Sequence, residues 1–253
     1  MKVVSWNLLC NNHRQAKSLS YVMGKLPEVV CLQEVSKETV RFLRKQQEYQ
    51  VFVARDFIKR TLGRGEEVFH LVLLVKKGIR VRAHHVRHIP HLTKNSFWDR
   101  AMRWTETLDF QWVEIEKEGE LYQVMNIHLE VGAGPHLRKK QFDHILESRG
   151  EQASLIVCGD FNLFGRWYVS PFVGWGMGFS VPELFVNERS MFEQLFLDYG
   201  LQNVFRNQVT FPFFRLQLDH ILVDKNLTVG STFVYPYTFF SDHRPLELEI
   251  VKK

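Results

Sequence analysis

The chain has 253 residues, of which 45% are hydrophobic and 24% charged, and its formal net charge is +5. This length is enough to bury an extensive core without disulfide support, and no apolar run approaches the ~18 residues of a membrane span. The composition is that of a soluble globular protein, and the positive charge suits an anionic partner such as nucleic acid or phospholipid.

Apolar, β-branched runs predict strands along the whole chain. In chain order they cover residues 2–7, 28–34, 68–76, 121–130, 154–162, 216–223 and 245–251, with further strands expected at 50–54 and 106–115. Helices are expected at residues 14–26, 36–48, 137–149 and 188–199. No linker rich in Pro, Gly or Ser divides these elements, so we expect one α/β domain over residues 1–253.

The cysteines and the N-terminal residues indicate in which cellular compartment the protein is expected. Cys10, Cys31 and Cys158 lie near or within apolar runs and lack metal-ligand spacing, so we expect buried free thiols in a reducing environment. The chain enters the strand-like KVVSWN directly, which leaves no room for a secretory signal. We therefore expect a cytoplasmic protein, and we expect it to be a monomer.

Residues 164–184 are rich in glycine and aromatic side chains, and we interpret them as a long functional loop. Arg166 and Trp167 in this loop are candidates for substrate binding, because aromatic rings beside positive charge can stack unpaired bases for ~1–3 kcal/mol per base. The same composition also suits a membrane interface, or rings that cap the core.

Residues with catalytic chemistry recur at the ends of the predicted strands. Asn7 closes the first strand and Glu34 the second, and a carboxylate at the tip of a core strand is costly to desolvate. Later strands repeat the pattern with Asn126 and His128, Asp160 and Asn162, Asp219, and Asp242 with His243. Residues two apart on a strand share a face, so the two spaced pairs should each point one way.

The series SWN, LQE, NIHLE, GDFN, LDHIL and SDHRP resembles the signature of the endonuclease/exonuclease/phosphatase superfamily, which has the deoxyribonuclease I-like fold. The resemblance spans residues 5–245. It implies a four-layer α/β sandwich of two packed mixed sheets flanked by helices, with the site where the loops at the strand ends converge. It also implies cleavage of phosphate esters with a divalent metal.

Magnesium is the metal that the resemblance implies, with manganese as a possible substitute. Mg²⁺ prefers oxygen donors and usually takes one or two protein carboxylates. Glu34 is the first candidate ligand, with Asn7 and Asp242 in support.

For proton transfer, the resemblance suggests His243, oriented by Asp219, since a carboxylate beside an imidazole fixes its tautomer and favours its protonated form. Asp160 is the other candidate to orient or deprotonate the attacking water. Asn162 and His128 would contact the phosphoryl oxygens or assist the leaving group.

Other candidates have weaker support in the sequence. Asn126 is a candidate for substrate binding, and Arg103 stands where the resemblance suggests a phosphate-binding arginine, with Arg100 as a competitor. The histidine-rich segment 82–94 is expected to be a solvated or basic loop without a metal.

We therefore expect a magnesium-dependent phosphodiester hydrolase, most simply a nuclease acting on DNA or RNA. The alternatives are a phospholipid phosphodiesterase or phosphatase, sphingomyelinase-like or directed at inositol phosphates, and a binding module on an inactive scaffold. The loops, not the fold, decide among these substrates.

Overall fold

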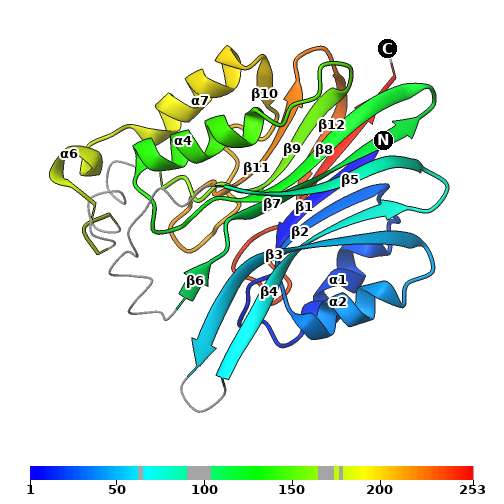
Figure 1. Ribbon diagram of the computed structural model, residues 1–253, viewed down its shortest axis with the longest axis horizontal. Coiled ribbons are helices and arrows are strands. Elements are labelled where there is room, and N and C mark those ends of the chain that lie inside the picture. Colours follow the sequence, from blue (N-terminus) through cyan, green and yellow to red (C-terminus); the bar gives the residue numbers. More distant parts are fainter. Residues whose placement is uncertain (62–64, 90–103, 165–173, 177–178, 253) are drawn as a thin grey trace.

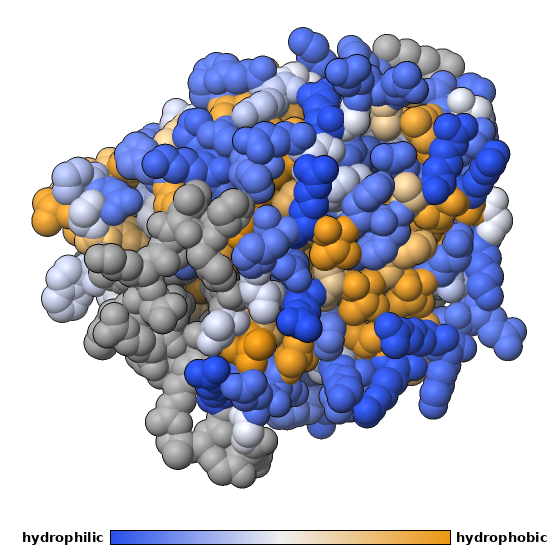
Figure 2. Space-filling model, in the orientation of Figure 1, coloured by the Kyte–Doolittle hydropathy of each residue, from blue (hydrophilic) through white to orange (hydrophobic). Residues whose placement is uncertain are grey.

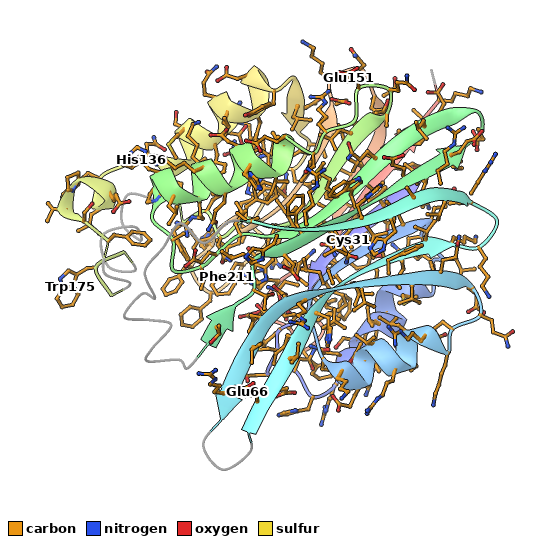
Figure 3. The ribbon with its side chains drawn as sticks, in the orientation of Figure 1. Cys31, Glu66, His136, Glu151, Trp175 and Phe211 are labelled. Atoms are coloured by element: carbon orange, nitrogen blue, oxygen red, sulfur yellow. The ribbon has the colours of Figure 1, made fainter. Side chains whose placement is uncertain are left out.

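The computed structural model describes residues 1–61, 65–89, 104–164, 174–176 and 179–252. Two β-sheets pack face to face at its centre, with helices on both outer faces (Figure 1). The three cysteines are free and buried, as expected, and Cys31 lies in the middle of the sandwich (Figure 3).

The first sheet contains both ends of the described chain. Its strands are β1 (Lys2–Asn7), β2 (Val29–Val35), β3 (Tyr49–Thr61), β4 (Gly65–Lys76), β6 (Trp104–Glu106), β12 (Thr228–Val234) and β13 (Leu246–Val251). They form a seven-stranded sheet in the order β12-β13-β1-β2-β4-β3-β6.

The second sheet is built from the middle of the chain. Its strands are β5 (Arg80–His88), β7 (Asp109–Lys117), β8 (Glu120–His128), β9 (Ser154–Asp160), β10 (Leu201–Asn203) and β11 (Asp219–Asp224). They form a six-stranded sheet in the order β10-β11-β9-β8-β7-β5.

The helices complete a four-layer sandwich, which confirms the predicted fold class. They are α1 (Gln15–Met23), α2 (Lys37–Arg44), α4 (Pro135–Leu146), α6 (Val181–Leu184) and α7 (Glu188–Asp198). Figure 1 shows α1 and α2 on the outer face of the seven-stranded sheet and α4 and α7 on that of the six-stranded sheet. Between the sheets, buried aliphatic residues such as Val3, Val113 and Ile221 form a separate core.

The structure confirms the main predicted strands and helices and corrects the segment 82–94. Residues 82–88 of it belong to the edge strand β5 (Arg80–His88) and do not form a loop, while residues 90–94 lie outside the described residues. Its ladder pairs with β7 alone, so most of its side chains reach solvent and no apolar run marks it in the sequence. His85 stacks on Trp112 with ring centroids 4.8 Å apart, and His84 hydrogen-bonds Gln111. Strand β12 was not predicted from the sequence for the same reason, because most of its side chains also reach solvent.

Strand direction explains why distant segments meet at one end of the sandwich. β1 is parallel to β2, and β8 is parallel to β9, so the carboxyl ends of all four strands lie together. β11 runs antiparallel to β9 and begins with Asp219 directly opposite Asp160. β13 runs antiparallel to β1 with Leu246 opposite Ser5, so His243, just before β13, lies beside the end of β1.

The surface in the view of Figure 2 is mostly hydrophilic, with apolar residues in patches among the polar ones. Among the described residues, no helix has both the length and the apolar character needed to cross a membrane.

The GDFN motif requires a glycine at position 159 because the neighbouring strand lies very close to the backbone there. A Cβ at this position would lie 2.0 Å from the main-chain oxygen of Ile127, on the paired strand β8. Only glycine therefore lets β9 pair closely with β8 immediately before Asp160.

We expect Gly159→Ala to lower the free energy of unfolding by about 1–3 kcal/mol, because the strands must move apart to admit the methyl group. Urea denaturation monitored by circular dichroism measures this. Gly150→Ala is the control: its Cβ would meet only Gln123 Oε1 at 3.7 Å, so a change within ~0.5 kcal/mol is expected. Equal effects of the two substitutions would contradict this account of the motif.

Candidate active site

Asp160, at the end of β9, is the centre of the polar cluster at the strand ends. Its side chain is 2% exposed. Oδ2 lies 3.8 Å from His128 Nε2 and 3.7 Å from His243 Nε2, and it accepts a hydrogen bond of 3.0 Å from Asn7 Nδ2. Oδ1 accepts the main-chain N–H of Asn162 at 2.9 Å. Two imidazoles and two N–H donors thus compensate the buried charge.

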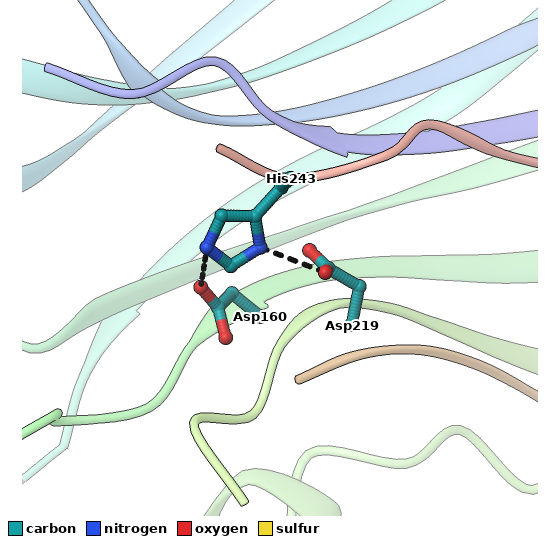
Figure 4. Close-up of side chains that lie close together, drawn as sticks. All are labelled: Asp160, Asp219 and His243. Carbon is teal, nitrogen blue, oxygen red and sulfur yellow. Dashed lines mark hydrogen bonds and ion pairs between the residues drawn. The ribbon is translucent and has the colours of Figure 1, made fainter. Parts of the chain in front are cut away.

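His243 reaches Asp160 from one side, held by Asp219 (Figure 4). Its Nδ1 lies 2.8 Å from Asp219 Oδ2, which leaves Nε2 directed at Asp160. The main chain is fixed as well, because Trp6 Nε1 donates to the His243 carbonyl at 2.9 Å and Ser241 Oγ accepts the His243 N–H at 3.1 Å. The predicted pairing of His243 with Asp219 is present in the geometry.

His128, the last residue of β8, reaches Asp160 from the other side, and its partner is a residue that sequence analysis missed. Asp56, in β3, lies 2.8 Å through Oδ1 from His128 Nδ1. Asp56 Oδ2 also accepts the main-chain N–H of Glu34 at 2.8 Å. The available signal was weak: Asp56 is a carboxylate two residues beyond the predicted strand 50–54 and next to the apolar Phe57.

Two β-bulges bring Asp56 and Glu34 together. The pairing of β2 with β4 shifts register between Leu32 and Val35, and that of β3 with β4 shifts between Arg55 and Ile58. Glu34, within the first shift, has a φ of 57°, a left-handed conformation that costs energy for a residue with a side chain. Bulges commonly redirect side chains beside functional sites, and here they aim both carboxylates at the cluster.

Glu34 and Asn7 form the adjoining oxygen-rich corner. Glu34 Oε1 accepts from Asn7 Nδ2 at 2.8 Å, and Oε2 accepts the Cys10 main-chain N–H at 2.7 Å. Gln15 secures this corner from α1, donating to the Glu34 carbonyl at 2.8 Å and accepting the Ser36 N–H at 2.9 Å. The same Asn7 nitrogen therefore bridges Glu34 and Asp160 across two strands.

Asn162 and Asp242 border this cluster. Asn162 is 5% exposed, has a φ of 53°, and donates through Nδ2 to the Leu129 carbonyl at 2.8 Å. Asp242 is the most open of the acids, with a side chain 42% exposed and Oδ1 3.8 Å from His243 Nε2. Asn162 follows the last residue of β9 by two positions, and Asp242 lies four positions before the first residue of β13.

The structure gives Asn126 a different position from the one expected for a substrate-binding residue. It shares the face of β8 with His128, but its side chain is completely buried between the sheets. Its amide donates to the carbonyls of Leu32 and Val72, both at 3.0 Å, and accepts from Gln33 Nε2 at 2.7 Å. With these bonds Asn126 connects the two sheets, and we withdraw it as a substrate contact.

Arg103, Arg166 and Trp167, the other residues expected to bind substrate, lie outside the described residues, as does Arg100. The described aromatics of segment 164–184 divide into two kinds. Phe164 is buried against Leu216 and Leu218, whereas Trp175 is 80% exposed and points away from the body of the molecule (Figure 3).

The donor set of this cluster fits a divalent cation. Ligand atoms of Asp160, Asp219 and His243 all lie within 4.8 Å of one another. Glu34 Oε1 faces the same amide nitrogen as Asp160 Oδ2 and adds a carboxylate from the other sheet. Hard oxygen donors of this kind are those that Mg²⁺ and Mn²⁺ take.

In the metal-free site the neighbouring carboxylates favour the protonated form of both imidazoles. Burial would lower the pKa of His243, but Asp219 and Asp160 outweigh it and raise the pKa to about 10. Burial opposes the charge on His128 in the same way, and Asp56, Asp160 and Glu34 raise its pKa well above the usual value. For Asp160, burial would raise the pKa, yet the two imidazoles bring it below the ordinary value.

Comparison with known proteins identifies the family. The sequence matches the Endonuclease/Exonuclease/phosphatase family over residues 4–243, and the chain belongs to that family. No curated protein sequence matches the chain.

Solved structures show the same fold at low identity. A humanized TDP2 of D. rerio superposes with a TM-score of 0.66 at 18% identity, covering 100% of this chain and 99% of that one. The human Nocturnin catalytic domain with bound sulfate superposes with a TM-score of 0.69 at 19% identity, covering 99% and 93%. A conserved protein of unknown function from Enterococcus faecalis reaches 0.69 at 19% identity over 100% of both chains.

We expect the metal-free protein to lose stability as the pH rises from about 6.5 to about 10. The folded-state pKa of His243 lies above its ordinary value of 6.5, so its charge stabilises the folded protein fully below pH 6.5 and no longer above its folded pKa. Urea denaturation in the presence of a chelator measures this dependence. His243→Gln, which cannot titrate, should lose this part of it, and an unchanged pH dependence in the variant would contradict the assignment.

We expect Asp56→Asn to lower the pKa of His128, because the carboxylate that stabilises the imidazolium is lost. Hydrolysis of bis(p-nitrophenyl) phosphate should then decline at a lower pH on the alkaline side of the pH–rate profile, with about a 10- to 100-fold loss near pH 8. Asp109→Asn is the control, since it removes the partner of the half-exposed His88, 3.0 Å away on the surface. A profile that moves equally in both variants would exclude a role for Asp56.

Proposed function

We propose that the chain is a divalent-metal-dependent phosphodiester hydrolase that acts on nucleic acid. The observation that carries the proposal is the position of the ionised Asp160, with an imidazole on either side that is itself held by a second aspartate. A site that cleaves a phosphodiester must neutralise the ester, accept a proton from water and stabilise the leaving oxygen. This cluster contains groups for each of these tasks.

Mg²⁺, or Mn²⁺ in its place, would be held by Glu34, with Asn7, Asp160 and Asp242 available in support. When bound, the cation supplies positive charge next to the phosphoryl oxygens and makes a bound water more acidic. The two carboxylates that share the Asn7 amide support this assignment.

Different side chains of the protein accept and donate the protons of the reaction. Asp160 accepts the proton of the attacking water, because it is the ionised group at the centre of the cluster. His243 and His128 donate from Nε2 to the phosphoryl and leaving oxygens, while Asp219 and Asp56 hold their Nδ1 atoms. Asn162 positions Asp160 through its main-chain N–H.

Two further observations are consistent with a nucleic-acid substrate. The chain carries a formal net charge of +5, which attracts a polyanion. Among the solved structures with this fold, a TDP2 of D. rerio is described in complex with a single-strand DNA product, with a TM-score of 0.68.

We expect Glu34→Gln and Asp160→Asn each to lower kcat for bis(p-nitrophenyl) phosphate by about 10²- to 10⁴-fold, because each removes a carboxylate that the transition state requires. A chelator should abolish the activity of the wild type, and Mg²⁺ or Mn²⁺ should restore it. Glu120→Gln is the matched control, because Glu120 is an exposed carboxylate at the end of β8 opposite His128. Metal-independent hydrolysis, or equal rates in the three variants, would overturn the proposal.

The substrate is tested with single-stranded and duplex DNA, RNA, sphingomyelin vesicles and phosphoinositides. We expect cleavage of the nucleic acids. Turnover confined to the lipids would refute the substrate class while leaving the metal chemistry in place.

A further inference from the structure

A pocket of about 510 Å³ lies on the α1 side of the seven-stranded sheet, outside the catalytic cluster. Its lining includes three basic residues, two acidic residues and a cysteine, namely His13, Arg14, Lys17, Glu38, Glu67 and Cys10. The volume lies within the range of about 300–1,000 Å³ typical of small-molecule sites. None of the catalytic roles assigned above uses this pocket.

The pocket shares a wall with the proposed metal ligand. The main-chain N–H of Cys10, which lines the pocket, donates to Glu34 Oε2 at 2.7 Å. Gln15, also in the lining, donates to the Glu34 carbonyl at 2.8 Å. A group bound in the pocket would therefore be the immediate neighbour of an ester held at Glu34.

Two cations of the pocket are arranged by an aromatic ring. Arg14 Cζ lies 5.1 Å and Lys17 Nζ 5.8 Å from the ring centroid of Phe240. Within the described part of the chain, neither cation forms an ion pair with a carboxylate, so their charge remains available to an anion. Phe240 itself is 47% exposed and stands two residues before Asp242 in the sequence.

Phe240 lies in a segment with a strained backbone conformation. Phe239 and Phe240 have φ values of 50° and 72°, a left-handed conformation that bulky residues rarely adopt. Surrounding contacts must impose it. Phe239 stacks on Tyr21 with centroids 4.6 Å apart, and its carbonyl accepts a hydrogen bond from Ser18 Oγ, so α1 holds the residue that precedes Phe240.

We propose that this pocket binds one unpaired nucleotide of the nucleic-acid substrate, adjacent to the phosphate that is cleaved. Arg14 and Lys17 bind the flanking phosphate, while Glu38 and Glu67 accept hydrogen bonds from base amino groups or sugar hydroxyls. Phe240 is a positioning residue that holds the two cations. This inference rests on the proposed function and names the form of its substrate.

The lining favours a whole nucleotide over a phosphate group alone. Carboxylates repel phosphate, so the side of the pocket with Glu38 and Glu67 requires hydrogen-bond donors, and a base or sugar supplies them. A base that is paired and stacked in a duplex must leave the stack before it can enter a separate pocket. The pocket therefore favours single strands, overhangs or frayed ends.

Binding is measured by fluorescence anisotropy with a labelled 10-nucleotide single-stranded DNA, in a chelator that prevents turnover. We expect Arg14→Ala combined with Lys17→Ala to weaken binding at least tenfold. The slope of log K against log salt should fall in magnitude by about 0.7, since the two cations bind one phosphate and each phosphate contact in a single strand contributes ~0.7. Lys25→Ala is the matched control, a cation beyond the end of α1 that pairs with Glu247.

A duplex of the same length separates a nucleotide pocket from a general phosphate contact. The double variant should affect the blunt duplex less than threefold. Equal losses for single strand and duplex would refute the pocket, and so would an unchanged affinity of the double variant for the single strand.

Phe240→Ala tests the positioning role through kinetics with the same oligonucleotide. KM should rise several-fold with kcat little changed, and Phe240→Trp should restore KM, because Trp holds cations at least as well as Phe. A fall in kcat with unchanged KM would contradict this role.

Measuring binding and cleavage of the oligonucleotide separately distinguishes the failure of this inference from the failure of the proposed function. If the wild type binds the single strand through Arg14 and Lys17 but cleaves no phosphodiester with Mg²⁺ or Mn²⁺, the proposed function fails and the nucleotide pocket stands. If it cleaves the oligonucleotide with the same KM in the wild type and the double variant, only the pocket fails. Binding to sphingomyelin vesicles in place of the oligonucleotide would overturn the pocket in favour of a lipid surface.

Discussion

Asp160 must keep a negative charge where almost no water reaches it, and much of the architecture at this end of the sandwich serves that requirement. An unpaired buried carboxylate would take up a proton instead of remaining ionised. Two imidazoles and the Asn7 amide supply the compensating groups, and each imidazole in turn needs a carboxylate of its own. The cluster is therefore stable only as a whole, because the removal of one member leaves a buried charge unpaired.

Much of this cluster could be predicted from the sequence because its members stand at strand ends. Asn7, Glu34 and Asp160 each terminate or nearly terminate an apolar run, and parallel pairing brings such ends together. Asp219 was recognised as a carboxylate inside the predicted strand 216–223, and the structure begins β11 at this residue. The order of the motifs identified the family, and the layers of the fold followed from it.

Other features depend on contacts that no local pattern records. Asp56 became a site residue through a register shift in β3, and a bulge of this kind leaves no clear mark in the sequence. Asn126 and His128 were correctly expected on one face of β8, but the two-residue offset places one deep between the sheets and the other at the edge. β5 was missed because an edge strand that faces water can carry charged residues at most positions.

Each aspartate–histidine pair joins one sheet to the other. Asp56 belongs to the seven-stranded sheet and holds a histidine of the six-stranded sheet, whereas Asp219 belongs to the six-stranded sheet and holds the histidine that leads into β13. Sliding of the layers by a few ångströms would break both pairs together while each layer kept its internal ladder. The geometry of the cluster therefore depends on the alignment of the two layers, and a shift between the layers would disrupt the cluster before the secondary structure.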